Sequence, residues 1–137
     1  MSTTASPREV FERLLAGITS GAWSELPSLY AADAVVELPF AAPGQTRLEG
    51  REAIRKHFEQ ASRAPLAMEA RIRTVHATSD PEVIVAEFDY DMHVVPEGQP
   101  FTVSNVQVLR VRDGLIQSTR DYHDHAAIAR GFAASKA

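Results

Sequence analysis

The chain has 137 residues, of which 45% are hydrophobic and 23% charged, and it contains no cysteine. This length fits a single domain over residues 1–137, and the lack of cysteine excludes disulfides, thiolate metal ligands and cysteine nucleophiles. The net charge is −4, and the basic residues form no stripe that would bind nucleic acid. No apolar run has the length of a signal peptide or a membrane span, so a cytoplasmic protein is expected.

Helices are predicted in the N-terminal half. The first begins after Ser6, which has the spacing of a capping box with Glu9, and apolar residues then recur at helical spacing until Gly21. A second, short helix is predicted over residues 23–31. A third is predicted to begin after Gly50.

From residue 68 onward the apolar residues no longer recur at helical spacing but at every second position, as in a strand. Strands are predicted over residues 68–78, 83–95, 101–112 and 115–124. A short strand over 35–38 and one or two helical turns within 126–137 complete the prediction. Because the connections between the later strands are short, the sheet is expected to be mostly antiparallel, which gives an α+β fold with helices covering one face of a curved sheet.

The strand predicted over 83–95 has two chemically different faces. One face is apolar and carries Ile84, Ala86, Phe88, Tyr90, Met92 and Val94. The other carries Glu87, Asp89, Asp91 and His93. Arginines at positions 71, 73, 110 and 112 of the adjoining strands are expected to form cross-strand ion pairs with this second face, on a solvated or dimer-forming surface.

The last predicted strand places four polar side chains on one face, namely Gln117, Thr119, Asp121 and His123. Such a row lies either in water or in a pocket where a carboxylate and an imidazole carry out proton chemistry. His123 and His125 share a strand face with Asp121, which raises the alternative of a metal site. No further ligand stands at a recognisable spacing, so neither a metal nor another cofactor is expected.

Several motifs, taken in order, resemble one superfamily. They are Tyr30-Ala-Ala-Asp-Ala34, Glu37-Leu-Pro-Phe40, Gly50-Arg-Glu-Ala-Ile54 and the closing Arg120-Asp-Tyr-His-Asp124. Over nearly the whole chain the pattern resembles the nuclear-transport-factor-2-like superfamily, and within it the SnoaL-like polyketide cyclases, the limonene-epoxide-hydrolase-like enzymes and the ketosteroid isomerases. The resemblance implies a cone-shaped α+β barrel, with helices packed on the sheet, and a homodimer formed through the outer sheet face.

The resemblance also implies which residues line the inside of the cone. The aspartate of the closing motif is Asp121, the candidate general acid or base, with His123 beside it and Glu37 as a second carboxylate. In an apolar cone the pKa of a carboxyl group is expected to rise, and two neighbouring carboxylates do not both ionise cheaply. The remaining lining is expected to come from Phe88, Tyr90, Met92, Val103, Asn105, Gln107 and Thr119, with Trp23, Tyr30 and Phe40 as core or wall aromatics.

These residues indicate cofactor-independent acid/base chemistry. The expected substrate is a small apolar carbonyl compound that undergoes isomerisation, aldol cyclisation or dehydration, with Tyr90 or Asn105 bonding its carbonyl oxygen. Phe88 and Tyr90 stand where the epoxide hydrolases carry an arginine and a second aspartate, which argues against their reaction unless the catalytic set is altered. A non-catalytic carrier of a small hydrophobic ligand and an interaction module that uses only the sheet face stay open as alternatives.

Overall fold

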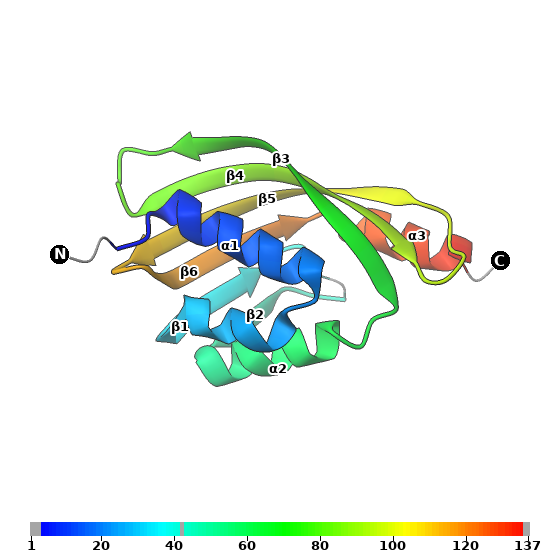
Figure 1. Cartoon of the computed structure of the whole chain (residues 1–137), viewed down its shortest axis with the longest axis horizontal. Coiled ribbons are helices and arrows are strands. Elements are labelled where there is room, and N and C mark those ends of the chain that lie inside the picture. Colours follow the sequence, from blue (N-terminus) through cyan, green and yellow to red (C-terminus); the bar gives the residue numbers. More distant parts are fainter. Residues whose placement is uncertain (1–3, 42, 136–137) are drawn as a thin grey trace.

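Figure 1 shows the computed structural model of the chain, which describes residues 4–41 and 43–135. The elements follow one another in this order: α1 (Pro7–Ser20), the 3-10 helix η1 (Trp23–Leu29), β1 (Tyr30–Leu38), β2 (Thr46–Glu49), α2 (Arg51–Ala61), β3 (Leu66–Ala77), β4 (Val83–Val94), β5 (Phe101–Arg112), β6 (Leu115–His123) and α3 (His125–Ser135). Most helical residues precede the long strands, as the sequence predicts for an α+β fold.

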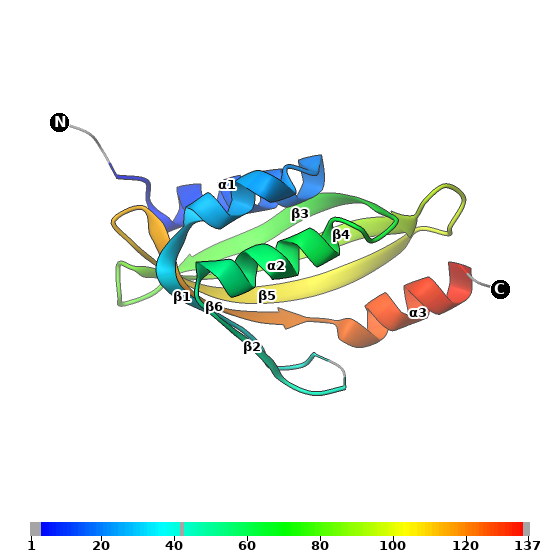
Figure 2. The ribbon, with the colours of Figure 1, turned by 90° about the horizontal axis from the view of Figure 1, so that it is seen from below.

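The strands form one curved sheet in the order β2-β1-β6-β5-β4-β3. Neighbouring strands are antiparallel except β1 and β6, which run parallel. Helices α1 and α2 lie on one face of the sheet, which curves around them without closing on itself, as Figure 2 shows. The predicted cone-shaped α+β fold, with helices packed on a curved and mostly antiparallel sheet, is confirmed.

Helix α1 forms where the sequence predicts it. The Ser6 side chain accepts a hydrogen bond from the Glu9 backbone nitrogen at 3.2 Å, and the Glu9 carboxylate accepts one from the Ser6 backbone nitrogen at 3.1 Å. Gly21 ends the helix in the left-handed region, with a φ of 79°. The buried face packs on the sheet, where the rings of Phe11 and Phe88 meet edge to face with centroids 5.3 Å apart.

The segment after α1 differs from its prediction. The helix expected over 23–31 is a 3-10 helix that ends at Leu29, and Tyr30 already belongs to β1, which is longer than the predicted strand 35–38. Pro27 inside this segment lacks the backbone donor that an α-helix needs. The Tyr30 carbonyl instead accepts hydrogen bonds from the side chain of Arg51 on α2, at 3.0 and 2.7 Å. Tertiary contact thus decides where the strand begins.

Two further elements were not predicted at their observed size. Strand β2 is a short edge strand that pairs with β1 and lies in a stretch for which no helix or strand was predicted. Helix α3 has 11 residues rather than one or two turns, and its Gly131 lies against the ring of Phe101, where an added Cβ would come within 2.5 Å. None of the helices that the structure describes is long and apolar enough to cross a membrane.

The core lies between the inner sheet face and the helices. Its largest fully buried apolar side chains are Phe11, Phe88, Leu14, Leu26, Ile54, Leu109 and Ile116. They come from α1, η1 and α2 on one side and from β4, β5 and β6 on the other. This apolar layer holds the sheet and the helices together, and it encloses part of a cavity.

The outer sheet face carries the predicted cross-strand ion pairs. Arg71 pairs with Asp91 at 2.6 Å and Arg73 with Asp89 at 2.9 Å. Arg110 and Arg112 differ from the prediction, because both bind Glu82 in the β3–β4 turn, at 2.9 Å in each case. They lie at the end of β5 that faces this turn, so the turn carboxylate is nearer than the acidic row of β4.

Candidate active site

A cavity of about 450 Å³ opens between the inner sheet face and the helices α1, η1 and α2. Its wall is mostly apolar and includes Leu14, Trp23, Ile54, Phe58, Met68, Phe88 and Met92. Polar side chains in the wall are Tyr30, Thr46, His57, Tyr90, Gln107, Asp121, His123 and His125. This volume lies in the range of small-molecule sites, and a few polar groups in an apolar wall are typical of them.

Asp121 is the only carboxylate among the described residues that line this cavity. It stands on β6 directly opposite Gln107 of β5, whose amide nitrogen donates a hydrogen bond to Asp121 Oδ1 at 2.8 Å. The bond holds one carboxylate oxygen in place and leaves Oδ2 without a bond to any described residue. A carboxylate held in this way can take up or release a proton at its second oxygen.

Two phenols share the cavity with Asp121. Burial, followed by the negative charge of Asp121, raises the pKa of both Tyr30 and Tyr90 above the ordinary value of 10.0. Both therefore stay protonated near neutral pH and act as donors. Neither hydroxyl group bonds to a described residue, so both can donate to an oxygen atom of a ligand.

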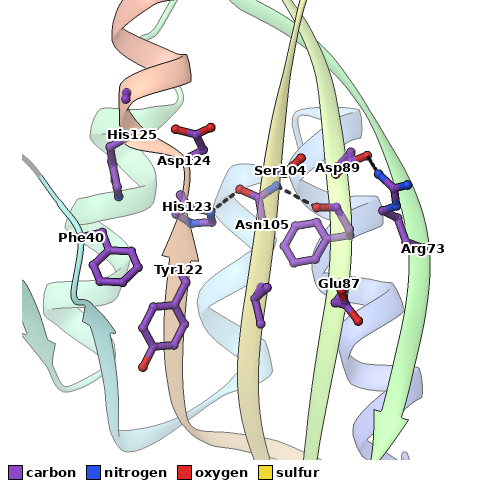
Figure 3. Close-up of a pocket in the computed structure, with 13 residues that line it drawn as sticks. Phe40, Arg73, Glu87, Asp89, Ser104, Asn105, Tyr122, His123, Asp124 and His125 are labelled. Carbon is purple, nitrogen blue, oxygen red and sulfur yellow. Dashed lines mark hydrogen bonds and ion pairs between the residues drawn. The ribbon is translucent and has the colours of Figure 1, made fainter.

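His123 lies next to Asp121 on the same side of β6 and is half-buried. Its Nδ1 lies 2.7 Å from Oδ1 of Asn105 on the neighbouring strand β5, as Figure 3 shows. Burial lowers the pKa of His123, and the nearby His57 and His125 rings act in the same direction, whereas the charge of Asp121 opposes them. The imidazole is therefore mainly neutral at neutral pH.

His57 also lines the cavity, although it was not among the residues predicted from the sequence. It lies on α2, three residues after the buried Ile54 and so on the same helix face, which is the signal that could have found it. Burial lowers its pKa, and the charge of Asp121 opposes this effect. His125, considered in the sequence only as a metal ligand, is the first residue of α3 and also lines the cavity.

Other predicted lining residues take different places. Trp23, Tyr30, Phe88, Tyr90, Met92 and Gln107 line the cavity. Val103 and Thr119 belong to the core on the same sheet face, each with 1% of its surface exposed, and neither lines the cavity. Asn105 is buried beside His123 on the inner side of β5, and it lines the groove that opens on the outer face rather than the cavity.

The expectation that Glu37 faces Asp121 is wrong. Along β1, Val36 and Leu38 line the cavity, and Glu37 between them points to the opposite face because strand side chains alternate. Its carboxylate lies 3.7 Å from Arg47 of β2. The cavity therefore does not contain a pair of carboxylates from these two strands.

Phe40 also lies outside the cavity, which corrects its prediction as core or wall. It follows the end of β1, where strand alternation no longer applies, and 64% of its surface is exposed. Its ring meets Tyr122 edge to face at 5.2 Å on the outer groove (Figure 3). Among the residues that the structure describes, no three His, Asp or Glu side chains are arranged to hold a metal ion.

Comparison with known proteins agrees with this architecture. A family model described as a SnoaL-like domain matches residues 11–119. The chain belongs to the SnoaL-like family. YesE of Bacillus subtilis (strain 168), an uncharacterised protein, is 32% identical over 114 residues, which cover 82% of the SnoaL-like chain and 76% of YesE.

Solved structures share the fold. A "Putative Isomerase from Bacillus subtilis" superposes with a TM-score of 0.85 at 27% identity, covering 94% of each chain. A protein of ketosteroid isomerase-like fold from Catenulispora acidiphila, in complex with trimethylamine, has a TM-score of 0.75 at 24% identity and covers 98% of the SnoaL-like chain and 95% of its own. The second likeness shows the fold alone.

Proposed function

We propose that this SnoaL-like protein catalyses proton transfer on a small, largely apolar carbonyl compound, with Asp121 as the proton carrier. The observation that carries this proposal is the isolated carboxylate of Asp121 in an apolar cavity that also holds two protonated phenols. Removal of a proton next to a carbonyl needs a base and a donor for the developing enolate oxygen. Asp121 supplies the base, and Tyr30 or Tyr90 supplies the donor.

The geometry gives these groups different roles in the reaction. The hydrogen bond from Gln107 engages Oδ1 of Asp121, so Oδ2 takes the substrate proton. A phenol hydroxyl then donates to the enolate oxygen, and the apolar wall strengthens this interaction by excluding water. The same Oδ2 returns the proton at another carbon, which completes an isomerisation without a cofactor.

Isomerisation is the first choice among the reactions that begin in this way. Aldol cyclisation and dehydration also start from an enolate, and the cavity can accommodate their substrates. A solved structure 27% identical to this chain carries the name of an isomerase, which supports the first of the three. Epoxide hydrolysis fits less well, because the described wall offers only one carboxylate to organise an attacking water.

The test uses a panel of β,γ-unsaturated cyclic ketones, with conjugation followed by absorbance and solvent deuterium incorporation followed by mass spectrometry. Asp121→Asn is expected to lower kcat by about 10²–10⁴-fold, the usual contribution of a general base. Asp33→Asn, at an exposed position of β1, is the matched control and is expected to keep full activity.

A carrier function is the second candidate, because most of the cavity wall is apolar. A carrier would bind these ketones without turnover, and Asp121→Asn would leave the affinity unchanged. Full turnover by Asp121→Asn would contradict the assignment of Asp121 as the proton carrier.

A further inference from the structure

The orientation of the buried Asn105 amide is fixed by its backbone neighbours. Its Nδ2 lies 3.2 Å from the carbonyl oxygen of Phe88 and 3.1 Å from that of Val103. Carbonyl oxygens only accept hydrogen bonds, so the group between them must be the amide nitrogen. The remaining atom, Oδ1, is therefore the one that faces His123.

This orientation determines where His123 carries its proton. Oδ1 of Asn105 only accepts, so Nδ1 of His123, at 2.7 Å, must donate. In the neutral ring the lone pair then lies on Nε2, which bonds to none of the described residues. Since His123 lines both the cavity and the adjoining groove, this nitrogen is an acceptor available to a ligand.

The titratable groups around the ring are Asp121, His57 and His125. Burial is the strongest influence and lowers the pKa of His123, and the two neighbouring imidazoles act in the same direction. The charge of Asp121 opposes them. The ring is thus mainly neutral at neutral pH, which keeps Nε2 unprotonated.

Gln107 offers a second acceptor by the same reasoning. Its Nε2 donates to the Asp121 carboxylate, so its Oε1 points away from that bond. This oxygen is buried without a hydrogen-bond partner in the described structure, and Gln107 is only 5% exposed. Gln107 and Asn105 are two residues apart on the inner side of β5, about 7 Å along the strand. A buried acceptor without a partner is costly unless a ligand or water supplies a donor.

We propose that the substrate carries a hydroxyl group in addition to its carbonyl group, and that Nε2 of His123 accepts a hydrogen bond from this hydroxyl. Asn105 is the positioning residue that keeps Nε2 unprotonated. The proposal rests on the proposed function for the carbonyl part of the substrate. The hydroxyl part rests only on the two acceptors described above, Nε2 of His123 and Oε1 of Gln107. Asn105 acts only through His123.

The first test reads the tautomer directly and needs no substrate. In ¹⁵N NMR of the histidine side chains, His123 of the native protein is expected to be protonated at Nδ1 and unprotonated at Nε2 near neutral pH. Asn105→Leu removes the acceptor and is expected to introduce the Nε2-protonated form. Asn105→Asp keeps an acceptor but adds negative charge, so Nδ1 stays protonated and the pKa of His123 rises.

A merely structural Asn105 would leave the tautomer of His123 unchanged in Asn105→Leu, and that result would overturn the proposal. Native His123 protonated at Nε2 would overturn it as well. Neither outcome depends on Asp121, so a failure here is distinguishable from a failure of the proposed function.

The second test compares a hydroxytetralone with its methyl ether by calorimetry. The native protein is expected to bind the hydroxyl compound about 10-fold more tightly, which corresponds to one hydrogen bond. His123→Phe is expected to abolish this preference while still binding the ether, and protonation of His123 at acid pH is expected to weaken it. Equal affinity of the native protein for the two compounds would overturn the hydroxyl assignment.

Discussion

At the residue scale, two half-buried imidazoles of the cavity, His57 and His123, affect the stability of the fold as well as the proposed chemistry. Burial is the first cause that lowers the pKa of His57 and of His123 below the ordinary value of 6.5. Above that value both rings are neutral in the folded and the unfolded chain. Below it the unfolded chain takes up protons first, so the free energy of unfolding falls as the pH falls.

We therefore predict that substitution of His57 and His123 weakens the pH dependence of the free energy of unfolding. Between about pH 7 and about pH 5, the free energy of unfolding measured with urea is expected to fall less in the variant His57→Gln/His123→Gln than in the native protein. The control is His93→Gln, on the outer side of β4. This variant is expected to show the same change of the free energy of unfolding with pH as the native protein. A native slope in the double variant would contradict this assignment of the two rings.

The residues of the site were predictable only in part. The resemblance of the closing motif led to Asp121 and His123, and the structure places both in the cavity wall. Glu37 was misplaced because a shift of one residue along a strand changes the face, and the sequence alone did not determine the register of β1. His57 was not predicted, because it lies outside the sequence motifs and its place in the wall depends on the packing of α2.

At the element scale, α1 was predictable because its capping box and its apolar period are local signals. The junction of η1 and β1 was not, because the bonds from Arg51 to the Tyr30 carbonyl join residues 21 positions apart. Strand β2 is short and depends on pairing with β1. Helix α3 packs against β5, and local propensity in an alanine-rich tail did not indicate that contact.

The Arg51 contact gives a prediction for the junction of α2 and β1. Both Nε and Nη2 donate to one carbonyl, and the shorter lysine side chain cannot reproduce that fork. Arg51→Lys is expected to lower the free energy of unfolding by about 1 kcal/mol, measured by urea denaturation. Arg55→Lys changes an arginine whose ion-pair partners among the described residues are Glu52 and Glu59 of the same helix, so it is the control and is expected to have a smaller effect. Equal effects of the two substitutions would contradict a specific role for Arg51.

At the scale of the whole molecule, the order of helices and strands was enough to predict the fold, whereas the reaction depends on a few side chains inside it. The same curved sheet can hold different polar groups in its cavity, because the apolar core supplies most of the wall and only a few positions in it carry polar side chains. In this chain those groups are one carboxylate, two phenols, three imidazoles, one carboxamide and one aliphatic hydroxyl. The chemistry therefore follows from their hydrogen bonds rather than from the fold.

The outer sheet face points to assembly of the whole molecule. A band of half-buried apolar residues, Val85, Val106, Val108 and Tyr122, crosses β4, β5 and β6 beside the ion pairs. Neither α1 nor α2 covers this face, as Figure 2 shows, and a groove of about 800 Å³ runs along it, with the exposed Phe40 at its border. Apolar residues flanked by charged pairs are suited to a self-complementary interface, in which the same patch meets its own copy.

We propose that two copies of the chain associate through this band, and sedimentation equilibrium at micromolar concentration is expected to give the mass of two chains. Val106→Arg places a charge at the centre of the band, where a two-fold axis would bring it close to its own copy, so this variant is expected to sediment as a monomer. Ser20→Arg, at the exposed end of α1, is the control and is expected to stay dimeric. A native mass of one chain would contradict the proposal, and a dimeric Val106→Arg would move the interface to another face.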